Sequence, residues 1–374
     1  MKRVLHISKY YYPFMGGTEQ IAQYCVNSLK GDYDQKVICF NHENGDRKDF
    51  VDEIEVFRCG CIVRISSQSI SLSYGKYLKT IFSSFHPDIV IFHYPNPFVA
   101  GILLGLISKK TKLIVYWHLD IVKQKFLRRF FVSQNIKLIK RADLLIATSP
   151  KYVDGSPYLK SAIDKCLVIP NCINAERHAL TDQILKTAGR IRSMHSGKII
   201  CLAVGRHIEY KGFKYLIRAS RHLDDRFEIY LAGEGEETKR LKKEASGDDK
   251  IHFLGAIDDD ELKAYFSAMD IFCFPSITKN EAFGLALAEA MFYGKPAVTF
   301  TIPDSGVNYV CLNGEDGIEV QNRNVDAYAA ALTMLADDPQ LRKQMGENAR
   351  NRVINNFLDD QFSENIKNAV KNLR

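Results

Sequence analysis

Short apolar segments alternate with stretches of helical periodicity in the first half of the chain. Helical patterns cover residues 18–29 and 122–140, for example. Strands that are apolar along their whole length are buried on both faces, and helical crossovers join parallel neighbours. This half therefore predicts a parallel sheet with helices on both sides. Its strands are VLHIS (4–8), KVICF (36–40), DIVIF (88–92), KLIVYWH (112–118), DLLIATS (143–149) and CLVIPN (166–171).

The same alternation starts again in the second half. Helical patterns at 213–223, 261–269 and 283–293 separate a new set of apolar segments. These are KIICLAVG (198–205), FEIYLAG (227–233), KIHFLG (250–255), DIFCFPS (270–276) and PAVTF (296–300). The architecture repeats although the sequence does not. We therefore predict an α/β protein with two facing, Rossmann-like, doubly wound domains and a central cleft between them, where ligands meet the carboxyl ends of the strands.

The boundary between the domains is predicted near IPNCINAERHAL (169–180), after the last strand of the first half. We assign an N-terminal acceptor-side domain to residues 1–172 and a nucleotide-binding domain to 173–355. Residues 356–374 are expected to form a helix that packs back toward the N-terminal domain.

Length and composition are those of a two-domain globular protein. The chain has 374 residues, and no run approaches the roughly 18–20 apolar residues of a membrane-spanning helix. The N-terminal stretch MKRVLHISKYYYP favours a first β-strand over a signal peptide. We therefore expect the protein in the cytoplasm, with its nine scattered cysteines as buried free thiols.

The net charge of +7 is unevenly distributed. Residues 121–142 contain seven Lys or Arg and no acid, interleaved with large apolar residues. Such a segment is either an ordinary amphipathic helix with a basic outer face or a docking surface for anionic lipid headgroups. The second interpretation predicts a peripheral protein on the inner face of the plasma membrane. No nucleic-acid partner is expected, because no recognition motif accompanies the charge.

Gly16 and Gly17 lie between the first predicted strand and the helix after it. Glycine lets a ligand approach the backbone closely, and a helix N-terminus offers free N–H groups. A phosphate or a sugar diphosphate suits such a site, although a plain strand-to-helix turn has the same composition. The stretch lacks the GxGxxG fingerprint, and no acid directly follows the second strand, so a nicotinamide dehydrogenase is disfavoured.

His118 and Asp120 end the fourth strand, in VYWHLD. Parallel strands deliver such residues to the ligand-binding edge of a sheet. An imidazole there can hydrogen-bond sugar hydroxyls, whereas a histidine buried in the core is the alternative.

Arg206 and Lys211 follow the first strand of the second half, in AVGRHIEYKG. Arginine can bind a diphosphate with two parallel hydrogen bonds, and lysine adds a point charge. Both would stabilise negative charge on a departing diphosphate. A solvated basic loop is the alternative.

Two further strand exits contain glycine. Gly235 in LAGEGEE and Leu254 in HFLGAI can bring backbone groups against a nucleobase, although ordinary turns explain both equally well. The acidic run DDDE (258–261) precedes an amphipathic helix, where helix capping explains it better than metal binding. We therefore predict no metal site.

The segment EAFGLALAEA carries two carboxylates, Glu281 and Glu289, in otherwise apolar surroundings. Residues 283–293 are apolar almost all round, which predicts a buried helix with Glu289 as its single charge. A buried carboxylate needs donors, which sugar or ribose hydroxyls or a cation can supply; capping a loop or pairing with a structural arginine is the alternative. The first N–H groups of this helix can meet a phosphate. They belong to Phe283, Gly284 and Leu285.

Taken in order, these motifs resemble the retaining glycosyltransferases of the GT-B fold, in particular the family-four (glycosyl transferases group 1) class. The resemblance spans the chain, and its second half contains the Glu, seven residues, Glu pattern of that class. Cys172 stands where a glycine is usual, so that turn is expected to differ. The motifs are PFMGGTE (13–19), WHLD (117–120), IPNCIN (169–174), VGRHIEYKGFKYLIRA (204–219), AGEGEE (232–237) and EAFGLALAEAMFYGKPAV (281–298).

The resemblance implies a nucleotide sugar as donor, bound mainly by the second domain. Glu289 would hold the ribose hydroxyls, and Arg206 and Lys211 would hold the diphosphate with help from Gly17. Transfer would retain the anomeric configuration, with the leaving phosphate accepting the proton of the acceptor hydroxyl. Neither a metal ion nor another cofactor is then required.

The resemblance also assigns the transferred sugar. Glu281, with the amides of Phe283 and Gly284, would contact it, and His118 would meet it from the N-terminal domain. Asp120 would lie on the acceptor side.

The expected reaction moves a hexose from a UDP- or GDP-sugar to a saccharide or lipid-linked glycan, and GDP-mannose is one candidate donor. The motif IPDSGVNYV (302–310) looks like that of transferases that build bacterial surface polysaccharides, including lipopolysaccharide. A sugar-nucleotide epimerase shares the architecture and would change the sugar without an acceptor. A catalytically inactive relative that only binds sugars is a third possibility, although Arg206, Lys211, Glu281 and Glu289 are all present.

Overall fold

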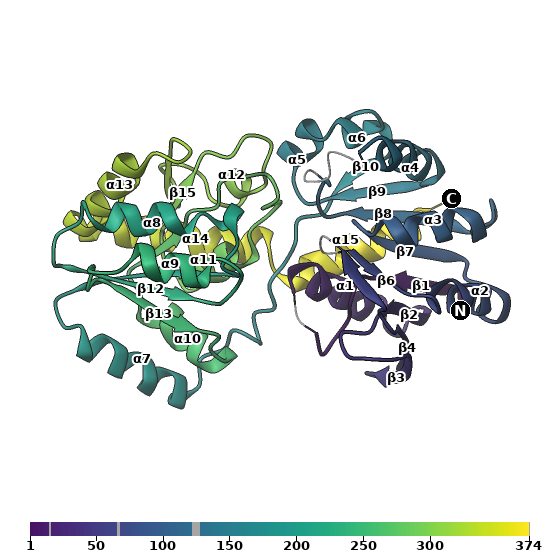
Figure 1. Cartoon of the computed structure of the whole chain (residues 1–374), viewed down its shortest axis with the longest axis horizontal. Helices are drawn as coiled ribbons and strands as arrows, with labels where there is room; N and C mark the ends of the chain where they lie inside the picture. Colours follow the sequence, from purple (N-terminus) through teal and green to yellow (C-terminus); the bar gives the residue numbers. More distant parts are fainter. Residues whose placement is uncertain (15, 66–67, 122–127, 374) are drawn as a thin grey trace. The chain divides into compact units, whose positions relative to one another are not determined.

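The computed structural model describes residues 1–14, 16–65, 68–121 and 128–373 (Figure 1). They form two compact units. Unit 1 comprises Met1–Asn171 and the C-terminal segment from Asp360, and unit 2 comprises Cys172–Asp359. Each unit has its own sheet of mainly parallel strands between helices, which confirms the predicted α/β, Rossmann-like fold class.

The main sheet of unit 1 has eight strands among the described residues, in the order β10-β9-β8-β7-β1-β2-β4-β3. Neighbours are parallel except β3 and β4. The strands are β1 (Arg3–Ile7), β2 (Asp34–Phe40), β3 (Arg47–Val51), β4 (Ile54–Cys59), β7 (Ile89–Tyr94), β8 (Lys112–Trp117), β9 (Leu144–Ala147) and β10 (Cys166–Val168). A separate antiparallel pair consists of β5 (Val63–Ile65) and β6 (Gln68–Ile70).

Helices α2, α3, α4 and α6 of unit 1 pack one against the next. The C-terminal helix α15 belongs to this unit, where Phe362 stacks near Tyr116 and Lys367 pairs with Asp32. The helices are α1 (Gly17–Ser28), α2 (Tyr74–Phe85), α3 (Pro97–Leu106), α4 (Arg128–Arg141), α5 (Pro150–Gly155), α6 (Pro157–Lys160) and α15 (Asp359–Lys371).

The sheet of unit 2 is parallel throughout, in the order β13-β12-β11-β14-β15-β16. In chain order this is 3-2-1-4-5-6, the arrangement of a dinucleotide-binding fold. The direction of winding reverses between β11 and β14, so the loops after these two strands lie side by side. The strands are β11 (Ile199–Val204), β12 (Phe227–Ala232), β13 (Ile251–Gly255), β14 (Ile271–Phe274), β15 (Ala297–Phe300) and β16 (Gly317–Val320).

Half of the helices of unit 2 begin at a residue whose side chain caps them. Asp258 accepts a hydrogen bond from the N–H of Glu261, which confirms capping as the role of the acidic run. The helices are α7 (Asp182–Met194), α8 (Phe213–Ser220), α9 (Thr238–Glu244), α10 (Asp259–Ala268), α11 (Leu285–Phe292), α12 (Val307–Val310), α13 (Val325–Asp337) and α14 (Pro339–Asn356).

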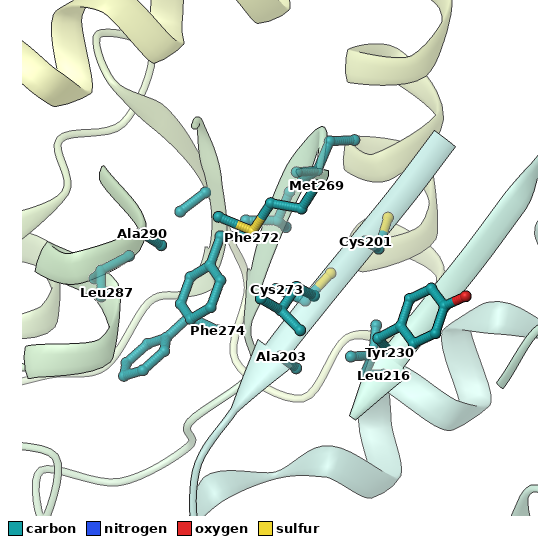
Figure 2. Close-up of a cluster of buried hydrophobic side chains, with 14 of the residues drawn as sticks. Cys201, Ala203, Leu216, Tyr230, Met269, Phe272, Cys273, Phe274, Leu287 and Ala290 are labelled. Carbon is teal, nitrogen blue, oxygen red and sulfur yellow. The ribbon is translucent and has the colours of Figure 1, made fainter. Parts of the chain in front are cut away.

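The core of unit 2 fills the space between its sheet and helices. Figure 2 shows Phe272 and Phe274 of β14 on the side of that strand where Leu287 of α11 lies. Cys273 alternates to the other side, next to Cys201 of β11. All nine cysteines are free and most are buried, which confirms the expected thiol state. None of the described helices combines the length and apolar character that a membrane crossing requires.

Candidate functional site

The loops after β11 and β14 meet at the point where the winding of unit 2 reverses. The first carries Arg206 and ends in a short 3-10 turn, Glu209–Lys211. The second runs from Pro275 to Gly284, the N-cap of α11. Ligands of open α/β sheets bind at such a reversal point, at the carboxyl ends of the strands.

Lys211 and Glu281 form an ion pair across these two loops. Lys211 Nζ lies 2.5 Å from Glu281 Oε2, and the two side chains are only 14% and 11% exposed. Ser276 Oγ donates to the same carboxylate oxygen at 3.0 Å, and Ser305 Oγ donates to the backbone oxygen of Glu281. Glu281 is therefore held by Lys211 from the loop after β11 and by Ser276 and Ser305 from the segments after β14 and β15.

The electrostatics of Lys211 follow from this pairing. Burial by itself lowers the pKa of the ammonium group, but the Glu281 carboxylate outweighs that effect, and the net pKa is raised. The ammonium group also lies over the ring of Phe274, 5.2 Å from its centre. Lys211 is therefore positively charged at neutral pH in a largely apolar setting.

Glycines allow the loops of this site to approach one another. Gly212 has φ +67°, and a Cβ atom there would lie 2.0 Å from the backbone oxygen of Pro275. At Gly235, a Cβ atom would lie 2.4 Å from the backbone oxygen of His207. Only glycine fits such contacts, so the Gly235 loop lies directly against the loop that carries Arg206.

Arg206 is exposed, and no acidic side chain in the described part of the chain is paired with it. Its guanidinium group contacts the phenol of Tyr210. Burial and Glu281 raise the pKa of Tyr210, which Arg206 and Lys211 partly offset, so this phenol is neutral. The guanidinium group therefore keeps donors available for an anionic ligand.

The start of α11 combines buried apolar contacts with open backbone. Phe283 is buried and packs edge-on against Phe357 with ring centres 5.3 Å apart. Gly284 has φ +94° and caps the helix without a side-chain hydrogen bond. Leu285 is the first helical residue and is half-buried. The first N–H groups of an α-helix have no intrahelical acceptor, so they can meet a ligand.

Glu289 lies one helical turn further along α11, with its side chain 17% exposed. Burial raises the pKa of this carboxyl to about 7, although Arg177 and Lys211 oppose the shift. Lys211 is therefore electrostatically coupled to both Glu281 and Glu289, which are also expected to bind the donor.

Leu254, another residue expected to bind the donor, is a half-buried residue of β13 that packs against the core.

In unit 1, Gly16 and Gly17 are placed at the N-terminus of α1. Gly16 is the N-cap, with no side-chain hydrogen bond, and Gly17 is the first helical residue. Glu19 in the first turn is buried and accepts a hydrogen bond from Thr18 at 2.8 Å. The open amides suit an anion, whereas the nearby carboxylate opposes one.

His118 follows β8 and is almost fully buried. Its Nε2 lies 3.0 Å from Nδ1 of His93 on β7, and the ring of Tyr116 stacks on both imidazoles. Burial lowers the pKa of His118 to about 3, and burial together with His118 lowers that of His93. Both rings are therefore neutral at pH 7 and share one hydrogen bond.

Asp120 is engaged inside unit 1. Trp117 Nε1 and Ser156 Oγ each donate to its Oδ1 at 2.9 Å, and its own N–H donates to the hydroxyl of Tyr152. These contacts fix the loop after β8.

The structure thus brings Arg206, Lys211, Glu281 and Gly235 together at the strand ends of unit 2, with Glu289 nearby. Unit 1 holds Gly16 and Gly17 at the N-terminus of α1 and His118 and Asp120 on the loop after β8. Sequence reasoning did not find His93, Ser276 or His178. Ser276 could have been found, since it directly follows a strand, but a histidine inside an apolar strand or a linker gives no local signal.

Two Rossmann-like units, the second with Arg206 and Lys211 at its reversal point, have the architecture of the GT-B class. The family model described as Glycosyl transferases group 1 matches residues 190–352. The model described as Glycosyltransferase Family 4 matches residues 15–177. The chain belongs to the glycosyl transferases group 1 class, which confirms the resemblance of its motifs, and it is a glycosyltransferase.

Similar proteins cover the whole chain. The D-rhamnosyltransferase WbpZ of Pseudomonas aeruginosa is 28% identical over 94% of this chain and 91% of its own. The O-antigen chain mannosyltransferase C of Escherichia coli is 27% identical over 99% of this chain and 98% of its own. The solved structure of sucrose-phosphate synthase from Thermosynechococcus elongatus has a TM-score of 0.81 at 17% identity, over 100% of this chain and 99% of that one. At this low identity, the similarity to the sucrose-phosphate synthase structure shows a shared fold only.

Proposed function

We propose that this glycosyltransferase moves a hexose, with retention of configuration, from a nucleoside diphosphate sugar to a saccharide or lipid-linked glycan. The observation that carries the proposal is the buried pair of Lys211 and Glu281 beside the exposed Arg206. A fixed cation and an exposed guanidinium at strand ends match a diphosphate, and the carboxylate matches sugar hydroxyls.

In this proposal the acceptor hydroxyl attacks the anomeric carbon while the bond from that carbon to the diphosphate oxygen breaks. Arg206 and Lys211 stabilise the charge that builds on the diphosphate, and the leaving phosphate takes the hydroxyl proton. No metal ion is assigned a role, because the two cations supply the positive charge.

The remaining contacts hold the donor. Glu281 and the amides at the start of α11 bind the transferred sugar, and Glu289 accepts hydrogen bonds from the ribose hydroxyls. His118 is the residue of unit 1 that we assign to the sugar. Its bond to His93 occupies Nε2, which leaves Nδ1 for a ligand.

The names of the two relatives support a donor sugar with the manno configuration. D-rhamnose is 6-deoxy-D-mannose, so a mannosyltransferase and a D-rhamnosyltransferase accept the same ring stereochemistry. We therefore propose a GDP-sugar such as GDP-mannose, and a growing O-antigen or related surface polysaccharide as acceptor. Such an acceptor places the enzyme in the cytoplasm, at the inner face of the plasma membrane.

A panel of UDP, GDP, UDP-glucose and GDP-mannose tests the donor class. At a hundredfold excess over Kd, the matching nucleotide is expected to raise the Tm by about 5–10 °C, because ligand binding stabilises the folded state by about 2.7 kcal/mol. We expect GDP compounds to stabilise the protein more than UDP compounds, as measured by thermal shift.

If none of these nucleotides shifts the Tm, the donor site in unit 2 is wrongly assigned. Incubation with GDP-mannose alone serves as the control for chemistry. Isomerisation of the sugar without an acceptor would support an epimerase instead, and NMR of a transfer product shows whether configuration is retained.

The basic segment 121–142 is proposed to contact anionic lipid. Residues 122–127 lie outside the described residues. In the rest of the segment, α4 buries Asn135, Leu138 and Ile139 and exposes Lys137 and Lys140, the pattern of an ordinary amphipathic helix.

Vesicle flotation separates the two interpretations of this segment. Binding is expected with anionic but not with neutral vesicles, and a Lys137→Glu/Lys140→Glu variant should bind at least tenfold more weakly, since each basic residue contributes about 1 kcal/mol at an anionic surface. Lys109→Glu/Lys110→Glu is the matched control, because these lysines are also exposed residues of unit 1 but lie outside the segment. Equal binding to both kinds of vesicle would contradict docking by charge.

A further inference from the structure

The side chain of Glu289 is mostly buried, with 17% exposed, and no described residue donates a hydrogen bond to its carboxylate. A basic side chain, His178, lies close to it, with Nε2 3.8 Å from Oε1. An ionised carboxylate in such a setting is unfavourable unless it gains donors. The two hydroxyls of a bound ribose supply some of them, but a carboxylate can accept about four hydrogen bonds.

His178 is held so that one ring nitrogen points at this carboxylate. Its side chain is 8% exposed, and Nε2 is buried without a hydrogen-bond partner among the described residues. The hydroxyl of Tyr293 donates to the backbone oxygen of His178 at 3.1 Å and lies 3.4 Å from Nδ1. The rings of Tyr293 and Phe292 pack against the imidazole. The ring therefore has little freedom to turn away from Glu289.

The charged groups around this pair are already engaged with other partners. Arg177 pairs with Asp259 at 2.6 Å, and Lys211 pairs with Glu281. Lys263 of α10 pairs with Asp260 at 3.0 Å. Each of these ions acts on the pair through space, but His178 is the side chain that aims a nitrogen at the Glu289 carboxylate.

We propose that His178 is a positioning residue for Glu289, donating its Nε2–H to Oε1 when a nucleotide binds and so directing Oε2 at the ribose hydroxyls. The proposal rests on the proposed function, in which Glu289 holds the ribose. A movement of less than about 1 Å shortens the 3.8 Å separation to hydrogen-bond length. An ionised Glu289 carboxylate can only accept hydrogen bonds, which favours the tautomer of His178 with its proton on Nε2.

The pKa values of Glu289 and His178 suit this hydrogen bond at neutral pH. Burial raises the pKa of Glu289 to about 7 and lowers that of His178 to about 4. His178 is thus a neutral donor, and Glu289 is partly protonated in the free protein. Ribose binding and the His178 N–H both favour the ionised carboxylate, so nucleotide affinity should fall as the pH falls through 7.

The test compares GDP with 2′,3′-dideoxy-GDP, with UDP and its dideoxy form run in parallel, by isothermal titration calorimetry. In His178→Phe, which keeps the ring but removes the N–H, the Kd of the normal nucleotide is expected to rise about tenfold to a hundredfold, since one hydrogen bond to a charged group is lost. The Kd of the dideoxy form should stay within twofold, because it offers Glu289 no hydroxyl.

Two more variants keep the test decisive if His178→Phe folds poorly. His178→Gln retains an N–H near the position of Nε2 and is expected to restore most of the affinity. His178→Asn is not expected to restore it, because the shorter side chain cannot bring its amide to the position of Nε2. In wild type the preference for the normal nucleotide over its dideoxy form should weaken as the pH falls below 7. The midpoint of this pH dependence should lie at higher pH in His178→Asn.

The outcomes separate this proposal from the proposed function. If wild type binds normal and dideoxy nucleotides equally, Glu289 does not hold the ribose, and the donor assignment fails. If wild type discriminates but His178→Phe and His178→Asn discriminate equally well, Glu289 acts without His178 and this proposal is wrong. An equal loss for both nucleotide forms would also overturn it, because it would show a packing role only.

Discussion

Replacing Arg206 by alanine is expected to lower kcat/KM for transfer by about 10²–10³, the usual loss when one preorganised group that stabilises transition-state charge is removed. The side chain is exposed and pairs with no acid among the described residues, so the Tm should change by less than about 1–2 °C. Steady-state transfer assays and thermal unfolding of the same preparation measure both effects.

Arg190→Ala is the matched control for this experiment. Arg190 is an exposed arginine on α7 of the same unit, so its removal changes the net charge equally. Its activity should remain within twofold of wild type. A comparable loss in both variants would mean that unit 2 acts through its overall charge, and full activity of Arg206→Ala would remove this residue from the mechanism.

Breaking the pair of Lys211 and Glu281 is expected to damage both stability and activity. Removing one partner leaves the other as an uncompensated buried charge, which costs about 3–5 kcal/mol. We expect Lys211→Met and Glu281→Gln each to lower the free energy of unfolding of unit 2 by an amount in this range, as measured by urea denaturation. Transfer activity should fall below about 1% in each, in line with the loss of charge stabilisation.

The double variant, Lys211→Met together with Glu281→Gln, separates the two roles. It leaves no unpaired charge, so most of the lost stability should return. Activity should not return, because the diphosphate has lost a cation and the sugar has lost a carboxylate. Recovery of activity would show that the pair only supports the fold, and a single variant with unchanged stability would contradict its burial.

Several helices and most parallel strands could be predicted from the sequence. The predicted strand KIICLAVG corresponds to β11 and DIFCFPS to β14, because a buried parallel strand is a continuous apolar run. The strands β3, β4, β5, β6 and β16 were not predicted. RKDFV carries three charges on an edge strand, and GIEV is too short to stand out from a turn.

The candidate site could be predicted only as separate residues. Arg206, Lys211 and Glu281 were found because each follows an apolar strand, and strand ends collect at the binding edge. The ion pair between Lys211 and Glu281 was not predicted, and His118 was considered without His93. Both contacts join neighbouring strands, and which strands are neighbours is not a local property of the sequence.

By itself, the sequence determined where most parallel strands lie and which polar residues follow them, since both depend on hydrophobic periodicity within a few residues. The tertiary structure decided which of these residues meet. Unit 2 places β14 beside β11, although β12 and β13 come between them in the chain, and this brings Glu281 to Lys211. The folding of residues 172–181 along the same unit brings His178 to Glu289. Such contacts depend on strand order and long-range packing, which no short pattern of apolar and polar residues encodes.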